Sequence, residues 1–124
     1  MSKANFSFSK RLQSFKYAFA GLKSLIKDEH NSRVHLFAAS IAVTAGILLE
    51  ITKTEWFVIL ILIGLVFSAE LFNSAIENIC DLVSPEKNDL VKKAKDQAAG
   101  AVLVIAMVAA IVGLWIFVPK IIEM

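Results

Sequence analysis

Two long stretches of the chain are almost purely apolar, and each predicts a helix that crosses a membrane. The stretch from Ala98 to Val118 contains no charged residue. At about 1.5 Å per residue, it spans the roughly 30 Å hydrocarbon core of a bilayer. The other stretch starts at Trp56, is interrupted by Glu70, and reaches membrane length when it continues to Ile76. The pattern therefore predicts transmembrane helices over about 98–118 and 55–76.

A third apolar stretch, Leu36 to Leu49, is only about fourteen residues long, a length more typical of a buried or re-entrant helix. We nevertheless predict a span over about 34–51, because the basic residues require a third crossing. Residues 1–33 carry seven of them and residues 87–95 carry four, but Lys53 and Lys120 are the only others. The positive-inside rule then places the N-terminus and the 78–97 loop in the cytoplasm and the C-terminus outside.

The N-terminal segment 10–28 has the pattern of an amphipathic helix. Its apolar residues repeat at spacings of three and four, and its lysines lie off that stripe: Leu12, Phe15, Phe19, Leu22 and Ile26 against Lys16, Lys23 and Lys27. Such a helix lies in the headgroup plane with its lysines near anionic lipid. Packing of the same face against the other helices is equally compatible, and both can hold together.

Composition supports a single integral membrane domain over residues 1–124. Hydrophobic residues make up 57% of the chain and charged residues 19%, against roughly 45–50% and 25% in soluble domains. The mean hydropathy is +0.68. Five glycines, two prolines and a lone Cys80 exclude collagen and disulfide scaffolds. A net charge of +2 gives no reason to expect nucleic acid as a partner.

Four polar residues share one face of the second predicted span. Glu70, Asn73, Glu77 and Asp81 are spaced by three, four and four residues, which aligns them on a helix. Like charges at this spacing repel, so the stripe requires a cation or a proton. A carboxylate at the depth of Glu70 costs about 2.5–3.5 kcal/mol and is a functional candidate by default. The alternative is that Glu70 is protonated, or paired in a contact between helices.

Two further clusters flank the spans. Glu29 precedes the first span, and if it meets Glu77, the two carboxylates with waters and phosphate oxygens would suit Mg²⁺. The nearby His30 and His35 are five residues apart and have no metal-ligand spacing. The run Lys92 to Asp96 serves topology or lipid headgroups, or else holds phosphates. The chain has no phosphate-binding loop of the Gly-x4-Gly-Lys-Ser/Thr type and no kinase-type glycine-rich loop.

The run Glu70 to Asp81 resembles the signature of the prokaryotic diacylglycerol kinase family, Glu-x-x-Asn-Ser-Ala-x-Glu-x-x-x-Asp. The resemblance extends to Tyr17 with Gly21-Leu22, to Glu29 with Arg33, and to Lys95-Asp96 before a last helix rich in small residues. It covers the chain from about residue 10 to 118.

This resemblance implies an all-α membrane protein: a homotrimer of three-span protomers, each with an N-terminal interfacial helix, in the bacterial inner membrane. It also implies transfer of the ATP γ-phosphate to the hydroxyl of a membrane lipid, diacylglycerol or undecaprenol, at sites between neighbouring protomers. Glu70 corresponds to the general base and Asn73 to a residue that orients it. Glu29 and Glu77 correspond to ligands of the Mg²⁺ that accompanies ATP.

The resemblance also implies the residues that contact the two substrates. On the nucleotide side these are Lys10 or Arg11 (a choice that one gap decides), Tyr17, Glu29, Glu77, Glu86, Asn88, Lys95 and Asp96. On the lipid side they are Glu70, Arg33 and Ala99. Some family members carry an acidic residue where His35 stands, and a histidine there resembles the branch that phosphorylates undecaprenol.

Two other classes of function compete with the lipid kinase. A small oligomeric channel or proton-coupled membrane subunit would use Glu70 as an intramembrane proton site. A non-catalytic assembly factor would carry only solvated surface charges. A channel needs neither Lys95-Asp96 nor Glu29, so these residues are the feature that discriminates the kinase from it.

Overall fold

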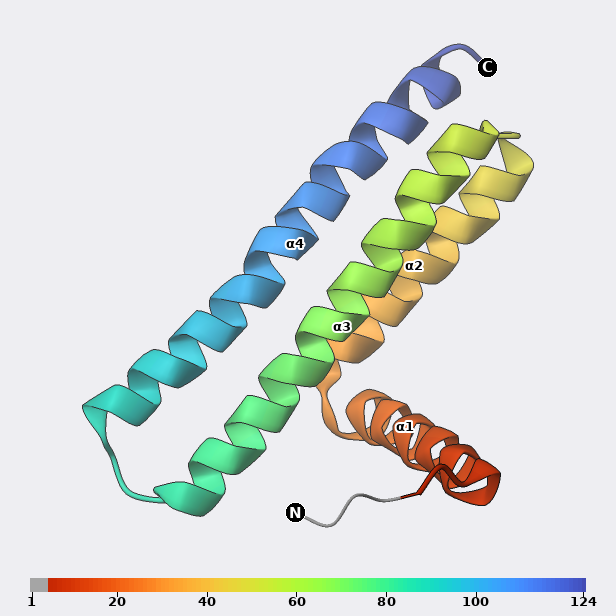
Figure 1. The fold of residues 1–124 in the computed structure, drawn as a ribbon. Coiled ribbons are helices and arrows are strands. Elements are labelled where there is room, and N and C mark those ends of the chain that lie inside the picture. Colours follow the sequence, from red (N-terminus) through yellow and green to blue (C-terminus); the bar gives the residue numbers. More distant parts are fainter. Residues whose placement is uncertain (1–4) are drawn as a thin grey trace.

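The computed structural model describes residues 5–124, which form four α-helices and no strand. These are α1 (Phe8–Asp28), α2 (His30–Leu48), α3 (Lys53–Val83) and α4 (Asp89–Ile122). The prediction of an all-helical chain is therefore confirmed for this part. Helices α2, α3 and α4 run side by side as long rods, and α1 lies across them at an angle near one end (Figure 1).

Local sequence explains where the helices begin and end. Ser7 caps α1 through its side chain. At α3, Thr52 and Glu55 form a reciprocal capping box that satisfies two backbone N–H groups. The side-chain oxygen of Asn88 accepts hydrogen bonds from two backbone N–H groups of α4. Helix α3 ends at Val83, directly before the turn that Ser84-Pro85 indicates.

Side-chain contacts fix the antiparallel register of the three long helices. His35 of α2 pairs with Glu70 of α3. At the other end of the same hairpin, a Cβ on Gly46 would lie only 2.8 Å from the ring of Trp56. Helix α2 therefore lies alongside the apolar first half of α3. Helix α4 follows α3 over nearly its full length, through the ion pairs Asp81–Lys95 and Glu55–Lys120.

The chain buries little of its apolar surface against itself. A small core of Ile51, Ile59 and Ile116 lies near the α2–α3 turn. Helices α3 and α4 are long and apolar enough to cross a membrane, yet only 17% and 0% of their most apolar segments are buried. A soluble core helix would be mostly covered, so these faces must meet lipid or other protein.

The helices extend beyond the apolar stretches that mark them in the sequence. Helix α3 continues past Ile76 to Val83, and α4 begins at Asp89, well before Ala98. Hydropathy detects only the apolar part of such a helix, whereas backbone hydrogen bonding continues until a cap or a proline ends it. Helix α2, with 19 residues, is not among the helices that reach membrane length and apolarity, so its role as a span stays a prediction.

Candidate active site

Glu70 is a buried carboxylate held by a histidine from the neighbouring helix. Its side chain is only 4% exposed, and its Oε1 hydrogen-bonds Nδ1 of His35, whose side chain is 27% exposed. The pair joins α2 to α3 at the end of the apolar stretch. A partner of this kind offsets the cost of burying the carboxylate. The sequence left open that Glu70 is paired in a contact between helices, and its Oε1 makes such a contact.

Two buried oxygens on the same face of α3 have no hydrogen-bond partner within the part of the chain that the structure describes. They are Oε2 of Glu70 and Oδ1 of Asn73. Buried side-chain oxygens are nearly always hydrogen-bonded in folded proteins, and exceptions point to a catalytic role, water or an ion. The spacing of three residues places both side chains on one face of α3, as neighbours one turn apart. Such oxygens can receive a hydroxyl, an amine or a cation.

An apolar cavity of about 320 Å³ extends from His35 between α2, α3 and α4. Small residues of α2 and α4, such as Ala38, Ala42 and Ala109, leave room opposite Val66 and Phe67 of α3. The volume is within the range of small-molecule sites, roughly 300–1,000 Å³. One end of the cavity therefore carries the histidine that holds Glu70, and the rest is lined by hydrocarbon.

Glu29, in the break between α1 and α2, reaches α3 one turn beyond Glu70. The hydroxyl of Ser74 donates a hydrogen bond to its Oε1 over 3.3 Å. Because Ser74 and Glu77 are three residues apart, Glu29 comes to the face of α3 that carries Glu77. Among the described residues, no cluster of three or more His, Cys, Asp or Glu side chains forms a metal cage. Two carboxylates are nevertheless enough for Mg²⁺ when waters and phosphates complete its shell.

A second polar group lies where α3 and α4 approach their connecting turn. Nζ of Lys95 donates to Oδ1 of Asp81 over 2.5 Å, and Nζ of Lys92 donates to Oδ2 of Asp96 over 2.6 Å. Lys95 precedes the uncharged stretch that starts at Ala98, and the hydrogen bond to Asp81 raises the pKa of its ammonium group. Lys95 is therefore a cation that can exchange a carboxylate for a phosphate oxygen.

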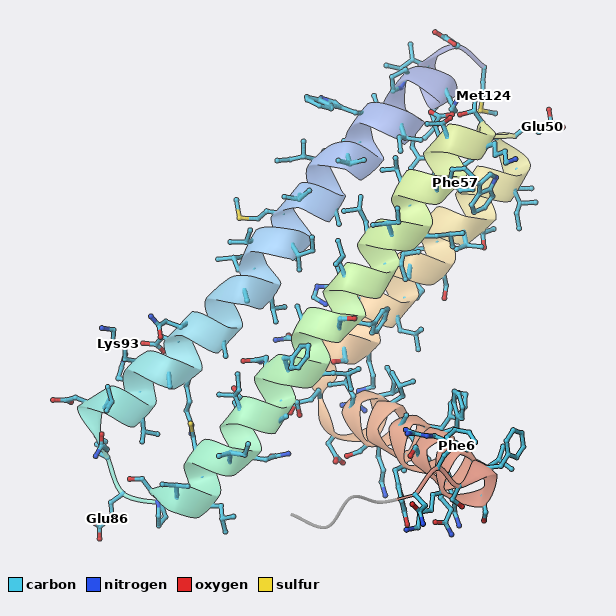
Figure 2. All side chains as sticks on the ribbon, viewed as in Figure 1. Phe6, Glu50, Phe57, Glu86, Lys93 and Met124 are labelled. Carbon is cyan, nitrogen blue, oxygen red and sulfur yellow. The ribbon has the colours of Figure 1, made fainter. Side chains whose placement is uncertain are left out.

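The α3–α4 turn carries two more of the sequence-predicted residues. Figure 2 shows Glu86 in this turn and Lys93 at the start of α4, at the end of the molecule opposite Glu50 and Met124. The backbone carbonyl of Glu86 accepts a hydrogen bond from Ser84. The side-chain oxygen of Asn88 is used in capping α4, so its amide nitrogen is the group that remains for a ligand.

The structure does not bring every predicted residue to α3. Lys10, Arg11 and Tyr17 are exposed on α1, Tyr17 by 68%. Within residues 5–124, no side-chain hydrogen bond or ion pair joins these three to another helix. Arg11 lies over the ring of Phe6 at 5.7 Å. Arg33 on α2 and Ala99 on α4 are also exposed. In a single chain, the acidic residues of α3 are thus separate from the predicted contacts on α1.

Sequence reasoning missed the partners of the two carboxylates. His35 was considered only as a metal ligand and for its place in the family pattern, and Ser74 only as part of the signature. The available signal was that a carboxylate at membrane depth needs a polar partner from another helix. His35 is the ionisable residue that directly precedes the Leu36–Leu49 stretch, which makes it a candidate for that partner.

Fold and site together define a class: a helical membrane protein with a buried, histidine-held carboxylate beside further acidic and basic groups. Comparison with known proteins gives the family. The family model described as prokaryotic diacylglycerol kinase matches residues 16–117. The chain belongs to this family, and it is a lipid kinase.

Individual relatives carry two different names. The undecaprenol kinase of Bacillus subtilis is 44% identical over 108 residues, which cover 87% of this chain and 88% of that protein. The diacylglycerol kinase of Haemophilus influenzae is 35% identical over 101 residues, covering 82% and 86%. The diacylglycerol kinase of Escherichia coli K12 is 29% identical over 104 residues, covering 84% and 85%. The resemblance seen in the motifs is thereby confirmed, and the channel and the assembly factor are set aside.

Proposed function

We propose that this protein transfers the γ-phosphate of ATP to the hydroxyl of a membrane lipid, with Glu70 as the general base. The observation that carries the proposal is the buried Glu70 carboxylate, with one oxygen held by His35 and the other without a hydrogen-bond partner among residues 5–124. The acceptor hydroxyl meets Oε2 of Glu70 and gives it the proton. The hydroxyl oxygen bonds to the γ-phosphorus as the bond to the bridging oxygen of ADP breaks.

The remaining polar residues position and neutralise the phosphates. Phosphoryl transfer depends on alignment and charge stabilisation more than on covalent chemistry. Lys95 faces the nucleotide as a cation, and Asn73 orients the groups around Glu70. Glu29 and Glu77 would hold Mg²⁺, which on binding lowers the repulsion between the phosphates and the acidic stripe. Contacts from Lys10 or Arg11, Tyr17, Glu86, Asn88 and Asp96 complete the nucleotide side, and Arg33 and Ala99 flank the lipid.

We infer the membrane placement of α2 from its register against α3. If α3 crosses the bilayer, α2 lies at the same depth, because His35 and Gly46 contact the α3 residues at either end of its apolar half. Nineteen residues rise about 28 Å, close to the hydrocarbon thickness. These facts support three spans. The basic residues of segments 1–33 and 87–95 support an N-terminus in the cytoplasm, and the family resemblance supports the bacterial inner membrane. Helix α1 then lies at the cytoplasmic interface.

Assembly into a homotrimer is supported by the uncovered apolar faces of α3 and α4 and by the exposed nucleotide residues of α1. One chain leaves Lys10, Arg11 and Tyr17 away from its own acidic stripe, and neighbouring copies can supply these contacts. The number three comes from the family resemblance.

Undecaprenol is the acceptor we favour over diacylglycerol. The relative that is 44% identical carries the name undecaprenol kinase, whereas relatives at 35% and 29% identity carry the name diacylglycerol kinase. His35, which resembles the undecaprenol branch, lines the cavity beside Glu70.

The test is a phosphorylation assay with radiolabelled ATP and Mg²⁺, offering undecaprenol and diacylglycerol side by side in lipid nanodiscs. We expect labelled undecaprenyl phosphate to dominate. Glu70→Gln keeps the shape of the side chain but accepts no proton, so kcat should fall by at least about 100-fold. Absence of labelled lipid from either acceptor, in protein shown to be assembled, would overturn the proposal; dominance of phosphatidic acid would reverse the choice of acceptor.

A further inference from the structure

We infer that His35 is a positioning residue for Glu70: it donates a hydrogen bond to Oε1 and so directs Oε2 at the lipid hydroxyl. This inference rests on the proposed role of Glu70. Nδ1 of His35 and Oε1 of Glu70 are the hydrogen-bonded atoms. An ionised carboxylate can only accept hydrogen bonds, so the proton of this bond belongs to Nδ1. The inference thereby assigns a proton to Nδ1 of the ring.

The geometry favours positioning over a simple connection between helices. A pair that only joins α2 to α3 would have its buried polar atoms satisfied. Here the second oxygen of the same carboxylate is buried and without a partner in the described residues, as is Oδ1 of Asn73 one turn away. His35 therefore occupies one oxygen and leaves the other for a group that the chain itself does not provide.

The surroundings of His35 fit a site that is approached from the bilayer. His35 lines one end of the apolar cavity between α2, α3 and α4. Among residues 5–124, His35 is the polar side chain that lines that cavity, and the remaining walls are alanine, glycine, aliphatic and phenylalanine residues. The Glu70 side chain next to His35 is 4% exposed, and a fixed donor keeps a carboxylate that is buried in this way in the reactive orientation.

Substitutions at position 35 separate the hydrogen bond from the ring. In asparagine, Nδ2 takes the place of the imidazole Nδ1, whereas in glutamine the amide nitrogen takes the place of Nε2. His35→Leu removes the donor and puts an apolar side chain in place of the imidazole. We expect His35→Leu to lower kcat about 10- to 100-fold, with the KM for ATP within about twofold because the nucleotide residues are untouched.

His35→Asn should recover activity to within about fivefold of wild type, and His35→Gln should recover less, because only asparagine presents its donor at Nδ1. Equal activity of His35→Leu and wild type would overturn the inference. So would an assembled His35→Asn as inactive as His35→Leu. If His35→Leu fails to assemble, the other two variants decide. Higher activity of His35→Asn than of His35→Gln supports the inference, and the reverse order overturns it.

A measurement without turnover tests the contact itself. The chain has two histidines, His30 and His35, so ¹⁵N-histidine labelling gives two assignable rings. Glu70→Gln should shift the Nδ1 resonance of His35 and leave that of the exposed His30 unchanged. An unchanged His35 signal would overturn the inference. Wild-type protein that phosphorylates no lipid would instead defeat the proposed function, and the two failures are thus distinguishable.

Discussion

Lys95 has two possible partners, and they lie on different molecules. In the free chain its ammonium group contacts Asp81. The two side chains are 36% and 66% exposed, and an ion pair this open contributes little to stability because water and salt screen it. A nucleotide phosphate carries more charge and can displace Asp81. On the proposed function, we therefore expect Lys95 to exchange Asp81 for a phosphate oxygen when the nucleotide binds.

This interpretation predicts different outcomes for the two halves of the ion pair. Lys95→Met should raise the KM for ATP about 10- to 100-fold, because a hydrogen bond to a charged phosphate is lost. Asp81→Asn breaks the same ion pair but keeps the lysine, so its KM should stay within about twofold. Steady-state kinetics at saturating lipid measure both. Equal effects of the two variants would show that the ion pair, rather than the nucleotide contact, is what matters.

Glu29 and Glu77 are expected to act through the divalent cation. Replacing either by glutamine removes a charge and keeps the shape, so activity should fall about 10- to 100-fold and the half-saturating Mg²⁺ concentration should rise. A Mg²⁺ titration at fixed ATP measures this shift. Glu123→Gln, at the exposed end of α4, is the matched control and should match wild type. An unchanged Mg²⁺ dependence in both variants would contradict the metal assignment.

The acidic face of the candidate site could be predicted from the sequence, but the partner of Glu70 could not. The spacing of Glu70, Asn73 and Glu77 defines a helical face without knowledge of the fold. Which residue meets Glu70 depends on the register of α2 against α3. That register follows from the α2–α3 turn and from the close packing of Gly46 on Trp56, and neither is visible in residue spacing.

At the scale of elements, Gly46 sets the distance between α2 and α3. A Cβ there would meet the Trp56 ring at 2.8 Å and Ile51 at 3.0 Å, whereas a Cβ on Gly64 meets nothing within 4 Å. Gly46→Ala should therefore lower the free energy of unfolding by about 1–2 kcal/mol, the cost of overpacking less the gain in helix propensity. Gly64→Ala should leave it unchanged or raise it by up to about 1 kcal/mol.

Unfolding by sodium dodecyl sulfate, followed by circular dichroism, measures both glycine variants. Adding Trp56→Phe to Gly46→Ala removes the outer ring of the indole and should restore part of the lost stability. Such coupling is expected only between residues in contact. A double variant no more stable than Gly46→Ala would show that the tryptophan does not limit the approach of the two helices.

Elements were easier to predict than their ends. The four helices all correspond to predicted segments. Helical periodicity and apolar stretches are properties of the sequence itself and do not depend on which helices pack together. The polar continuation of α3 to Val83 and of α4 back to Asp89 carries no hydropathy signal. The 3,4,4 spacing from Glu70 to Asp81 indicates part of the α3 extension, whereas the Asn88 cap and the Asp81–Lys95 contact appear only in the structure.

At the scale of the whole molecule, the number of spans decides where the C-terminus lies. Three spans place the two termini on opposite sides of the membrane, whereas α3 and α4 alone would place them on the same side. With the N-terminus in the cytoplasm, an alkaline phosphatase fused after Met124 should be active and a green fluorescent protein fused there should be dark. A fluorescent C-terminal fusion would remove α2 from the set of spans.

Contacts within one chain indicate how each active site is divided between protomers. The family resemblance implies sites between protomers, yet the structure joins Glu29 to Ser74 and His35 to Glu70 within a single chain. We therefore expect the acidic half of each site to come from one protomer, with neighbours adding nucleotide contacts from α1.

Mixing Glu29→Gln with Glu70→Gln protomers should then restore no activity. If the two carboxylates came from different protomers, random mixing would restore about a quarter of the wild-type rate. Co-expression with two affinity tags, followed by the phosphorylation assay, distinguishes these results. Recovery to that level would assign Glu29 to its neighbour's site.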